Sequence, residues 1–349
     1  MINMRRASLI AIFVGTALAL AAWTFWRREI IMNEKVTLPP MKTICVGRHL
    51  MALPSDLSLR GDVDLVYGLD KNFKTVKVEV LRESGTTPTF DALVAKKVAE
   101  LTAQSNEDVP SKNMLAGWRK IDEGTVLIRA NTEISERGFF TALVVVQRGA
   151  AVGLVTADIF DHDKPEDIEA KALAVAKNIS FVSDPEKAGK GTCLGPLLID
   201  ANQDGEWISV SGRSASHPDV DVDIHVNSLV AESDGGLLKR VEEKSGPMAK
   251  MGMLFKPIRK GNVVIAGRPG EEFLESDKDE QGKIFRLYNA ETLITKPSTF
   301  LEPSFTFHLN MGGQLPDSDQ YVDASFDEAQ SLALWDYIIK SIRLRPGSI

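Results

Sequence analysis

The sequence predicts an α+β fold of two related lobes, each a mainly antiparallel sheet with about two packed helices, after an N-terminal transmembrane helix. Three observations predict it. Residues 44–52 and 192–200 nearly repeat each other, so that Cys45 and Cys193 lie 148 positions apart. Many short runs alternate apolar and polar residues, which is the period of a half-buried strand. Near the N-terminus, an uncharged run of 20 residues is long enough to span a membrane.

The repeat continues beyond the cysteines. At the same offset, Val76 aligns with Ile224 and Val78 with Val226. With gaps, two further pairs of runs match, 126–130 with 263–267 and 175–181 with 338–344. We interpret this as a diverged duplication. It predicts three parts, namely a membrane anchor and spacer (1–40), a first lobe (41–185) and a second lobe (189–347), with a polar linker between the lobes.

The uncharged run is Ala7 to Trp26, flanked by two arginines on each side. Its length and its terminal tryptophans suit a membrane-spanning helix. A cleaved signal peptide is the alternative, because small residues near Ala21 resemble a cleavage site. We favour the uncleaved helix. It predicts a single-pass protein of the bacterial inner membrane with both lobes facing the periplasm.

The charge of the chain disfavours some partners. The formal net charge is −7, and residues 43–349 hold 35 basic residues against 46 acidic ones. This acidic excess disfavours nucleic acid and acidic lipid surfaces as ligands. It favours a partner with a basic face.

The chain contains two cysteines, at equivalent places in the two repeats. An oxidising compartment permits a disulfide between the lobes. Equivalent positions meet only where a pseudo-twofold axis passes between them, however. We therefore favour the alternative that Cys45 and Cys193 are small buried residues at the starts of matching strands.

Helical spacing predicts two helices in each lobe, which begin after Thr89, near Asp163, at Leu237 and near Ser325. Two of them show a capping-box pattern, Asp163 with Glu166 and Ser325 with Glu328. In the closing helix we expect Trp335 to be part of the buried stripe.

The run from His217 to His225 holds three aspartates and two histidines. In a strand, one face would carry Asp219, Asp221, Asp223 and His225. Successive residues on that face are about 7 Å apart, too far for several to reach one ion at about 2 Å each. We therefore interpret them as a solvated outer face. Residues 200–205 match half of a calcium loop, but Ser211 replaces its last glutamate, which favours a turn.

The sequence also lacks the common motifs of enzymes. It has no Gly-x-Ser-x-Gly, no P-loop and no dinucleotide fingerprint, and its five histidines are scattered without partner motifs. This favours a binding protein that is not an enzyme, with no cofactor, no bound metal and no small-molecule substrate.

Four segments carry a resemblance to a known family. They are residues 45–50, 267–274, 303–307 and, above all, 334–347, which reads Leu-Trp-Asp-Tyr-Ile-Ile-Lys-Ser-Ile-Arg-Leu-Arg-Pro-Gly. These segments resemble the immunity proteins cognate to the fourth class of type VI secretion lipase effectors. The resemblance spans residues 43–347 and is strongest in the second lobe. It implies two α/β lobes that grip a toxic phospholipase in the periplasm and obstruct its active-site entrance and lid.

The densest acidic cluster in either lobe is our candidate contact with that effector: Glu271, Glu272, Glu275, Asp277, Asp279 and Glu280. A solvated charged loop is the alternative interpretation. Two other functions are kept as alternatives. One is an extracytoplasmic metal-dependent hydrolase that uses Asp219, Asp221, Asp223 and His225, and the other is a scaffold of an envelope complex.

Overall fold

The structure is a computed structural model that describes residues 36–69, 73–82, 88–132, 139–160, 163–232, 235–250, 257–315 and 318–349. The expected membrane helix from Ala7 to Trp26 lies outside these residues. Within them, no helix has both the length and the apolar character needed to cross a membrane.

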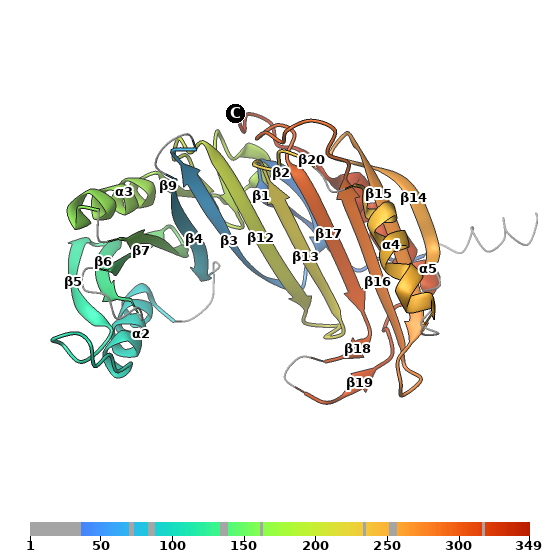
Figure 1. The fold of residues 1–349 in the computed structure, drawn as a ribbon, viewed down its shortest axis with the longest axis horizontal. Coiled ribbons are helices and arrows are strands. Elements are labelled where there is room, and N and C mark those ends of the chain that lie inside the picture. Colours follow the sequence, from blue (N-terminus) through green and yellow to red (C-terminus); the bar gives the residue numbers. More distant parts are fainter. Residues whose placement is uncertain are drawn as a thin grey trace, which may run out of the picture.

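A twelve-stranded antiparallel sheet forms the frame of the molecule (Figure 1). Its six strands from the first half are β3 (Leu57–Tyr67), β4 (Lys74–Arg82), β8 (Ala151–Ile159), β7 (Phe140–Arg148), β6 (Thr125–Asn131) and β5 (Leu115–Asp122). The second half adds β12 (Gly205–Ser214), β13 (Val220–Asn227), β17 (Ser304–Met311), β16 (Ile284–Thr292), β15 (Arg268–Lys278) and β14 (Pro257–Ile265). The two sets join where β3 pairs with β12.

A six-stranded sheet packs on one face of the large sheet. Its order is β20 (Arg343–Leu344), β2 (His49–Pro54), β1 (Met41–Gly47), β10 (Thr192–Leu194), β11 (Leu197–Ile199) and β9 (Ile179–Phe181). A separate small hairpin is formed by β18 (Gly313–Gln314) and β19 (Tyr321–Val322). The helices are α2 (Phe90–Ala103), α3 (Pro165–Lys177), α4 (Leu237–Lys250) and α5 (Glu328–Ser341), with a 3-10 turn η1 (Pro185–Lys187).

In both sheets, the strands of the first half and the equivalent strands of the second half follow the same order from the centre to the edge. In the large sheet β3, β4, β8, β7, β6 and β5 mirror β12, β13, β17, β16, β15 and β14. In the small sheet Val46 pairs with Leu194, the residue 148 positions later. The duplication is therefore visible in the topology, with a pseudo-twofold axis between β1 and β10.

The expectation of two lobes, each with its own sheet, holds only in part. The fold is α+β with antiparallel sheets and four α-helices in the described residues, as expected. However, both sheets continue from one half into the other, and one apolar core contains residues of both halves, such as Val63 and Ile208. The two halves thus form one continuous body in the structure.

The axis brings the two cysteines together, so the favoured interpretation of two unpaired residues is wrong. Cys45 and Cys193 form a disulfide whose Cα atoms are 5.6 Å apart. Both side chains are buried. The sequence repeat also has a structural reason. Gly47 ends β1 and Gly195 directly follows β10, and both adopt a positive φ, of 61° and 56°.

The remaining matches between the repeats are displaced in part. The runs 175–181 and 338–344 both cover the end of a closing helix and the short strand after it, as expected. The run 263–267 ends β14, however, whose counterpart in strand order is β5 and not β6. Short apolar runs look alike, so the sequence match moved by one strand.

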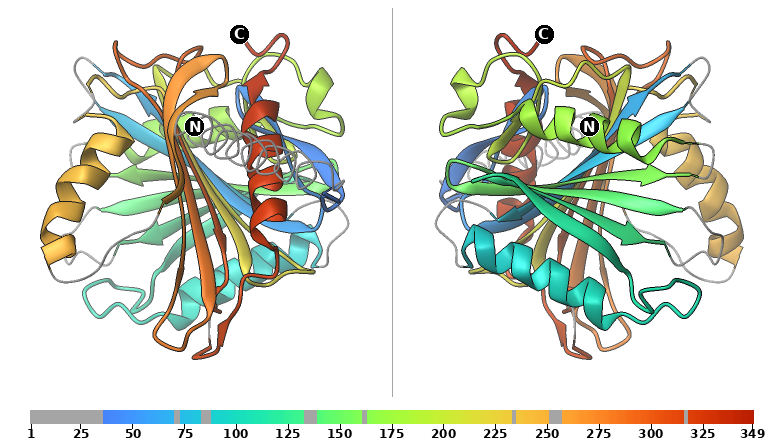
Figure 2. Two further views of the ribbon diagram at one scale, coloured as in Figure 1. Left: turned by 90° about the vertical axis from the view of Figure 1, so that its right-hand side faces the viewer. Right: turned by 90° about the vertical axis from the view of Figure 1, so that its left-hand side faces the viewer.

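Helices α3 and α5 cover the same face as the small sheet, and their apolar residues join its core. Helices α2 and α4 pack on the opposite face, α2 over β5 and β6 and α4 over β15. Figure 2 shows α4 and α5 on opposite sides of the twisted sheet. As expected, Trp335 is completely buried.

The helix starts differ from the predicted capping boxes. Thr89 is the N-cap of α2 as predicted, accepting from the Ala92 N–H at 3.3 Å. Helix α3 begins at Pro165, because proline suits the first helical position, and Asp163 instead pairs with Lys74. Helix α5 has its capping box two residues later than expected, between Asp327 and Gln330.

Candidate functional site

On the face that carries α2 and α4, no helix or strand of the described residues covers the middle of the large sheet. We call this surface the open face. Direct strand pairing places its side chains together, as when Ser209 of β12 lies between Asp62 of β3 and His225 of β13. Its members, all exposed or half-buried, are Ser58, Arg60, Asp62, Asp64, Lys77, Glu79, Trp207, Ser209, Ser211, Arg213, Asp221, Asp223, His225 and Asn227.

A groove with a volume of about 670 Å³ runs along the open face, lined in part by Arg60, Asp62, Glu79, Asp223 and His225. A second hollow of about 630 Å³ adjoins it and is lined by Arg213 and Asp221 among others. The two hollows share residues of β3, β12 and β13. They therefore form one polar depression across the central strands.

Ion pairs and hydrogen bonds order part of this surface. Lys77 Nζ lies 2.6 Å from Asp62, and Arg213 lies 3.1 Å from Asp221. The hydrogen bond to Asp62 raises the pKa of Lys77. Burial raises the pKa of Asp64, although Lys77 opposes this shift. Five carboxylates and three cations lie on the open face, so its formal charge is negative.

The aspartates and histidine of β13 do belong to a half-exposed strand face, as predicted. Asp221, Asp223 and His225 alternate with fully buried valine and isoleucine side chains. Asp219 is buried instead and accepts the Ser325 N–H at 2.9 Å. Nowhere in the described part of the chain do three or more such side chains group closely enough to hold a metal ion.

The six acidic residues nominated from the sequence do not form one surface. Glu272 is buried under α5, paired with Arg259 at 2.7 Å and accepting from Trp335 Nε1 at 2.8 Å. Glu271 points to the other face, where it accepts the Leu238 N–H at the start of α4, at 2.9 Å. Alternation along β15 therefore separates neighbouring carboxylates.

The other four members also differ in environment. Glu275 is buried, which raises its pKa to about 7, and Asp277 adds to the shift. Asp279 shapes a turn by accepting the N–H groups of Gln281 and Lys283. Asp277 and Glu280 are the exposed members. The six residues therefore do not share one exposed surface in this structure.

A second groove lies at the far end of the same face, between α2 and the edge strand β5. Its volume is about 670 Å³, and it is mainly apolar, with Phe90, Val94, Val98 and Trp118 in its lining. Trp118 is 55% exposed. The same side of the large sheet therefore has both the polar open face and an apolar groove.

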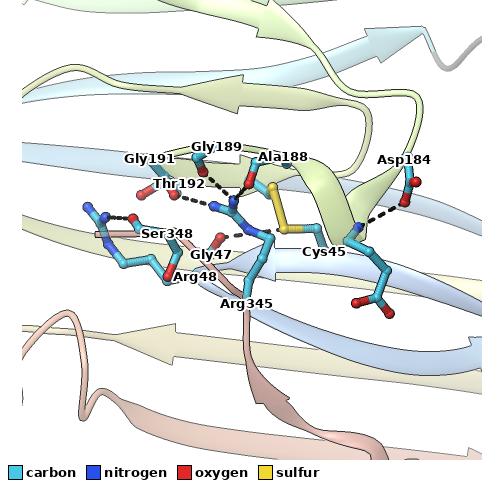
Figure 3. Close-up of a disulfide and its surroundings, with 12 residues drawn as sticks. Cys45, Gly47, Arg48, Asp184, Ala188, Gly189, Gly191, Thr192, Arg345 and Ser348 are labelled. Carbon is cyan, nitrogen blue, oxygen red and sulfur yellow. Dashed lines mark hydrogen bonds between the residues drawn. A yellow bond between two sulfur atoms is a disulfide. The ribbon is translucent and has the colours of Figure 1, made fainter.

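A buried charged cluster holds the halves together beside the disulfide (Figure 3). Arg345, near the C-terminus, donates to the carbonyl oxygens of Ala188, Gly189 and Gly191, the last at 2.6 Å. Arg48 donates to the carbonyl of Ser348 at 2.6 Å. The C-terminal tail is therefore fixed to the segment between the halves through Arg345, and to the turn between β1 and β2 through Arg48.

Glu206 completes this cluster as its buried acid. Its carboxylate lies 3.5 Å from Arg48 and accepts hydrogen bonds from Thr192 and Gln203. Burial raises the pKa of Glu206, while Arg48 acts in the opposite direction. Nearby, burial lowers the pKa of His49 to about 4, and its ring packs edge-on against Phe305. These groups are internal and support the fold.

Sequence reasoning missed most of the open face. Arg60, Asp62 and Glu79 belong to no motif, and only pairing across the duplication brings them together with β12 and β13. One signal was present in the sequence. In residues 205–214 Trp207 falls on the polar side of the alternation, with Ser209, Ser211 and Arg213.

The fold is that of solved immunity proteins of the type VI secretion system. The apo immunity protein TplEi of Pseudomonas aeruginosa is 22% identical, with a TM-score of 0.61 over 88% of this chain and 98% of that one. The structure of the Tle4-Tli4 complex contains a chain that is 21% identical, with a TM-score of 0.62 and the same coverage. TplEi in complex with the "L" peptide is 20% identical, with a TM-score of 0.58.

The sequence itself points to the same group. Residues 187–347 match the family described as the Tle cognate immunity protein 4 C-terminal domain. No curated protein matches the chain in a sequence comparison. The resemblance found in the sequence is thus confirmed, and it is anchored in the second half, where the sequence motifs are strongest.

Proposed function

We propose that this chain is an immunity protein that binds and inhibits a cognate type VI secretion phospholipase effector in the periplasm. The observation that carries the proposal is the family match of residues 187–347. A fold shared over 88% of the chain with a protein solved in a Tle4-Tli4 complex supports it. On this proposal the chain acts by binding and performs no reaction.

The two halves clamp the effector together and block the entrance to its active site. Because the large sheet is continuous and the linker is held by Arg345, the halves present one wide surface. On this proposal, the effector binds to the open face, between α2 and α4. The boundaries 41–185 and 189–347 then describe the duplicated units within one body.

The N-terminal run from Ala7 to Trp26 anchors this clamp in the inner membrane, where it meets a toxin delivered into the periplasm. Its length and its terminal tryptophans support the anchor. The Cys45–Cys193 disulfide supports an oxidising compartment. Cell fractionation should find the full-length chain in the inner membrane. A processed N-terminus near Ala22 and a soluble periplasmic pool would contradict the anchor.

The function is tested by protection and by inhibition. Cells that express the full chain should survive periplasmic expression of the Tle4-class lipase of the same strain, and the purified chain should inhibit that lipase with 1:1 stoichiometry. Protection should persist after chelation of metal ions. Survival lost on chelation would favour a metal-dependent hydrolase. An envelope protein that co-purifies without any resistance would favour a scaffold.

A further inference from the structure

The open face carries a large exposed aromatic side chain that the fold does not require. Trp207 is 52% exposed, although it lies within the central strand β12. Its direct strand partners, Asp64 and Asn227, are polar and half-buried. In contrast, Trp335 is fully buried in the core.

An exposed tryptophan can indicate a binding site, because burying its side chain contributes a large free energy of binding. Tryptophan is the residue type most enriched at binding hot spots, where a large apolar ring and an N–H donor are buried together. Single exposed apolar residues are common on protein surfaces. Trp207, however, stands beside a groove of about 670 Å³, two residues along its strand from the lining residue Ser209.

The charge around Trp207 indicates the chemistry of the partner. Asp62, Glu79 and Asp223 line the groove, and Asp64 lies directly opposite Trp207. Arg60 and Lys77 are the nearby cations on β3 and β4, and Lys77 is already paired with Asp62. A guanidinium or ammonium group entering this groove would find acceptors and would lower the cost of ionising Asp64.

We propose that Trp207 and the acidic groove beside it are the central anchor of the effector contact, and that they receive a protruding basic segment of the effector. This inference rests on the proposed function. The indole packs on the aliphatic part of an arginine or lysine side chain whose charged end reaches Asp62, while Glu79 and Asp223 accept from other cations of the same segment. Charge complementarity with the acidic open face selects a basic segment over an acidic one.

The test measures binding of the full chain in detergent micelles to the catalytically inactivated Tle4-class lipase of the same strain. Trp207→Ala should weaken binding at least about tenfold. The pair Asp62→Asn and Asp223→Asn should slow association about threefold to tenfold and flatten its salt dependence. Matched controls lie on the opposite side of the sheet, namely Tyr337→Ala on α5 and the pair Glu166→Gln and Asp167→Asn on α3. They should bind like the wild type.

Thermal unfolding checks that each variant folds, and Trp207→Gln replaces the alanine variant if that one does not fold. If the wild type binds and the Trp207 and aspartate variants match it within about twofold, the anchor is wrong and the proposed function stands. If the wild type neither binds nor inhibits the lipase, the proposed function fails. If Trp207→Ala instead abolishes self-association of the chain, the occupant is a second copy, and the effector contact is wrong.

Discussion

Glu272 and its neighbours on β15 show how little the spacing of charged residues reveals about what each one contacts. Glu271 and Glu272 are adjacent in sequence but lie on opposite faces of the large sheet, one at the start of α4 and the other beneath α5. The sequence identifies six acidic residues close together. It does not show that Arg259 and Trp335, far apart in the chain, meet one of them.

Glu272→Gln should destabilise the protein by about 2 to 4 kcal/mol, because it removes the buried carboxylate that pairs with Arg259 and accepts from Trp335. Asp336→Asn is the matched control. Asp336 contacts the same Arg259 from a half-exposed position, so its loss should cost less than about 1 kcal/mol. Urea unfolding measures both. Equal effects would contradict an internal role for Glu272.

Glu275 should make the stability depend on pH. Burial raises its pKa to about 7, so the folded state binds a proton more tightly than the unfolded state, whose pKa is near 4.5. Stability from this group is therefore complete below pH 4.5 and is lost as the pH rises to about 7. His49 has the opposite effect. Its pKa is lowered to about 4, so its contribution to the stability of the protein is lost as the pH falls.

The test compares the free energy of unfolding at pH 5 and pH 8. Between these values the wild type should lose about 1 to 2 kcal/mol more than Glu275→Gln, a magnitude reduced because water reaches part of the carboxyl group. Glu280→Gln, at an exposed neighbour, should behave like the wild type. A Glu275→Gln variant with an unchanged pH dependence would show that the carboxyl group ionises freely in the folded protein.

At the scale of elements, the sequence predicts strands and helices well and their ends poorly. Alternation placed β13 correctly, and Thr89 was identified as the residue that precedes α2. Two capping boxes were wrong because several side chains near a helix start fit the same pattern. Pro165 decides the start of α3, and Asp219, which receives the Ser325 N–H, leaves Asp327 as the cap of α5.

The capping box of α5 is testable by two alanine variants. Asp327→Ala should cost about 1 kcal/mol, because its carboxylate accepts the Gln330 N–H at 2.8 Å and closes the box. Ser325→Ala should cost less than about 0.5 kcal/mol, since the structure uses the backbone N–H of Ser325. Thermal unfolding measures the difference. A larger loss of stability in Ser325→Ala than in Asp327→Ala would instead support the capping box that the sequence predicted, between Ser325 and Glu328.

At the scale of the whole molecule, the sequence revealed the duplication but not how its copies join. The repeat around Cys45 and Cys193 identifies equivalent residues. It contains no signal that β3 pairs with β12 or that β1 pairs with β10, because alternation shows which side of a strand is buried and not which edge is paired. The open face depends on those pairings, so it could not be predicted either.

The disulfide is the covalent consequence of this symmetry. It closes a loop of 148 residues across the axis, and such a crosslink stabilises by reducing the entropy of the unfolded chain. Replacing Cys45 and Cys193 by serine should therefore cost about 2 to 5 kcal/mol. Cys45→Ser alone should cost nearly as much, since one cysteine cannot form the bond.

Thermal unfolding with and without a reductant provides the measurement. Reductant should lower the melting temperature of the wild type toward that of the double variant, and it should leave the double variant unchanged, because the chain contains only 2 cysteines. Full-length chain isolated from the cell membranes should show no free thiol after denaturation. Two free thiols in that material would mean that the halves are joined by their sheets, their shared core and the Arg345 contacts alone. The crosslink would then contribute nothing to joining the halves in the cell.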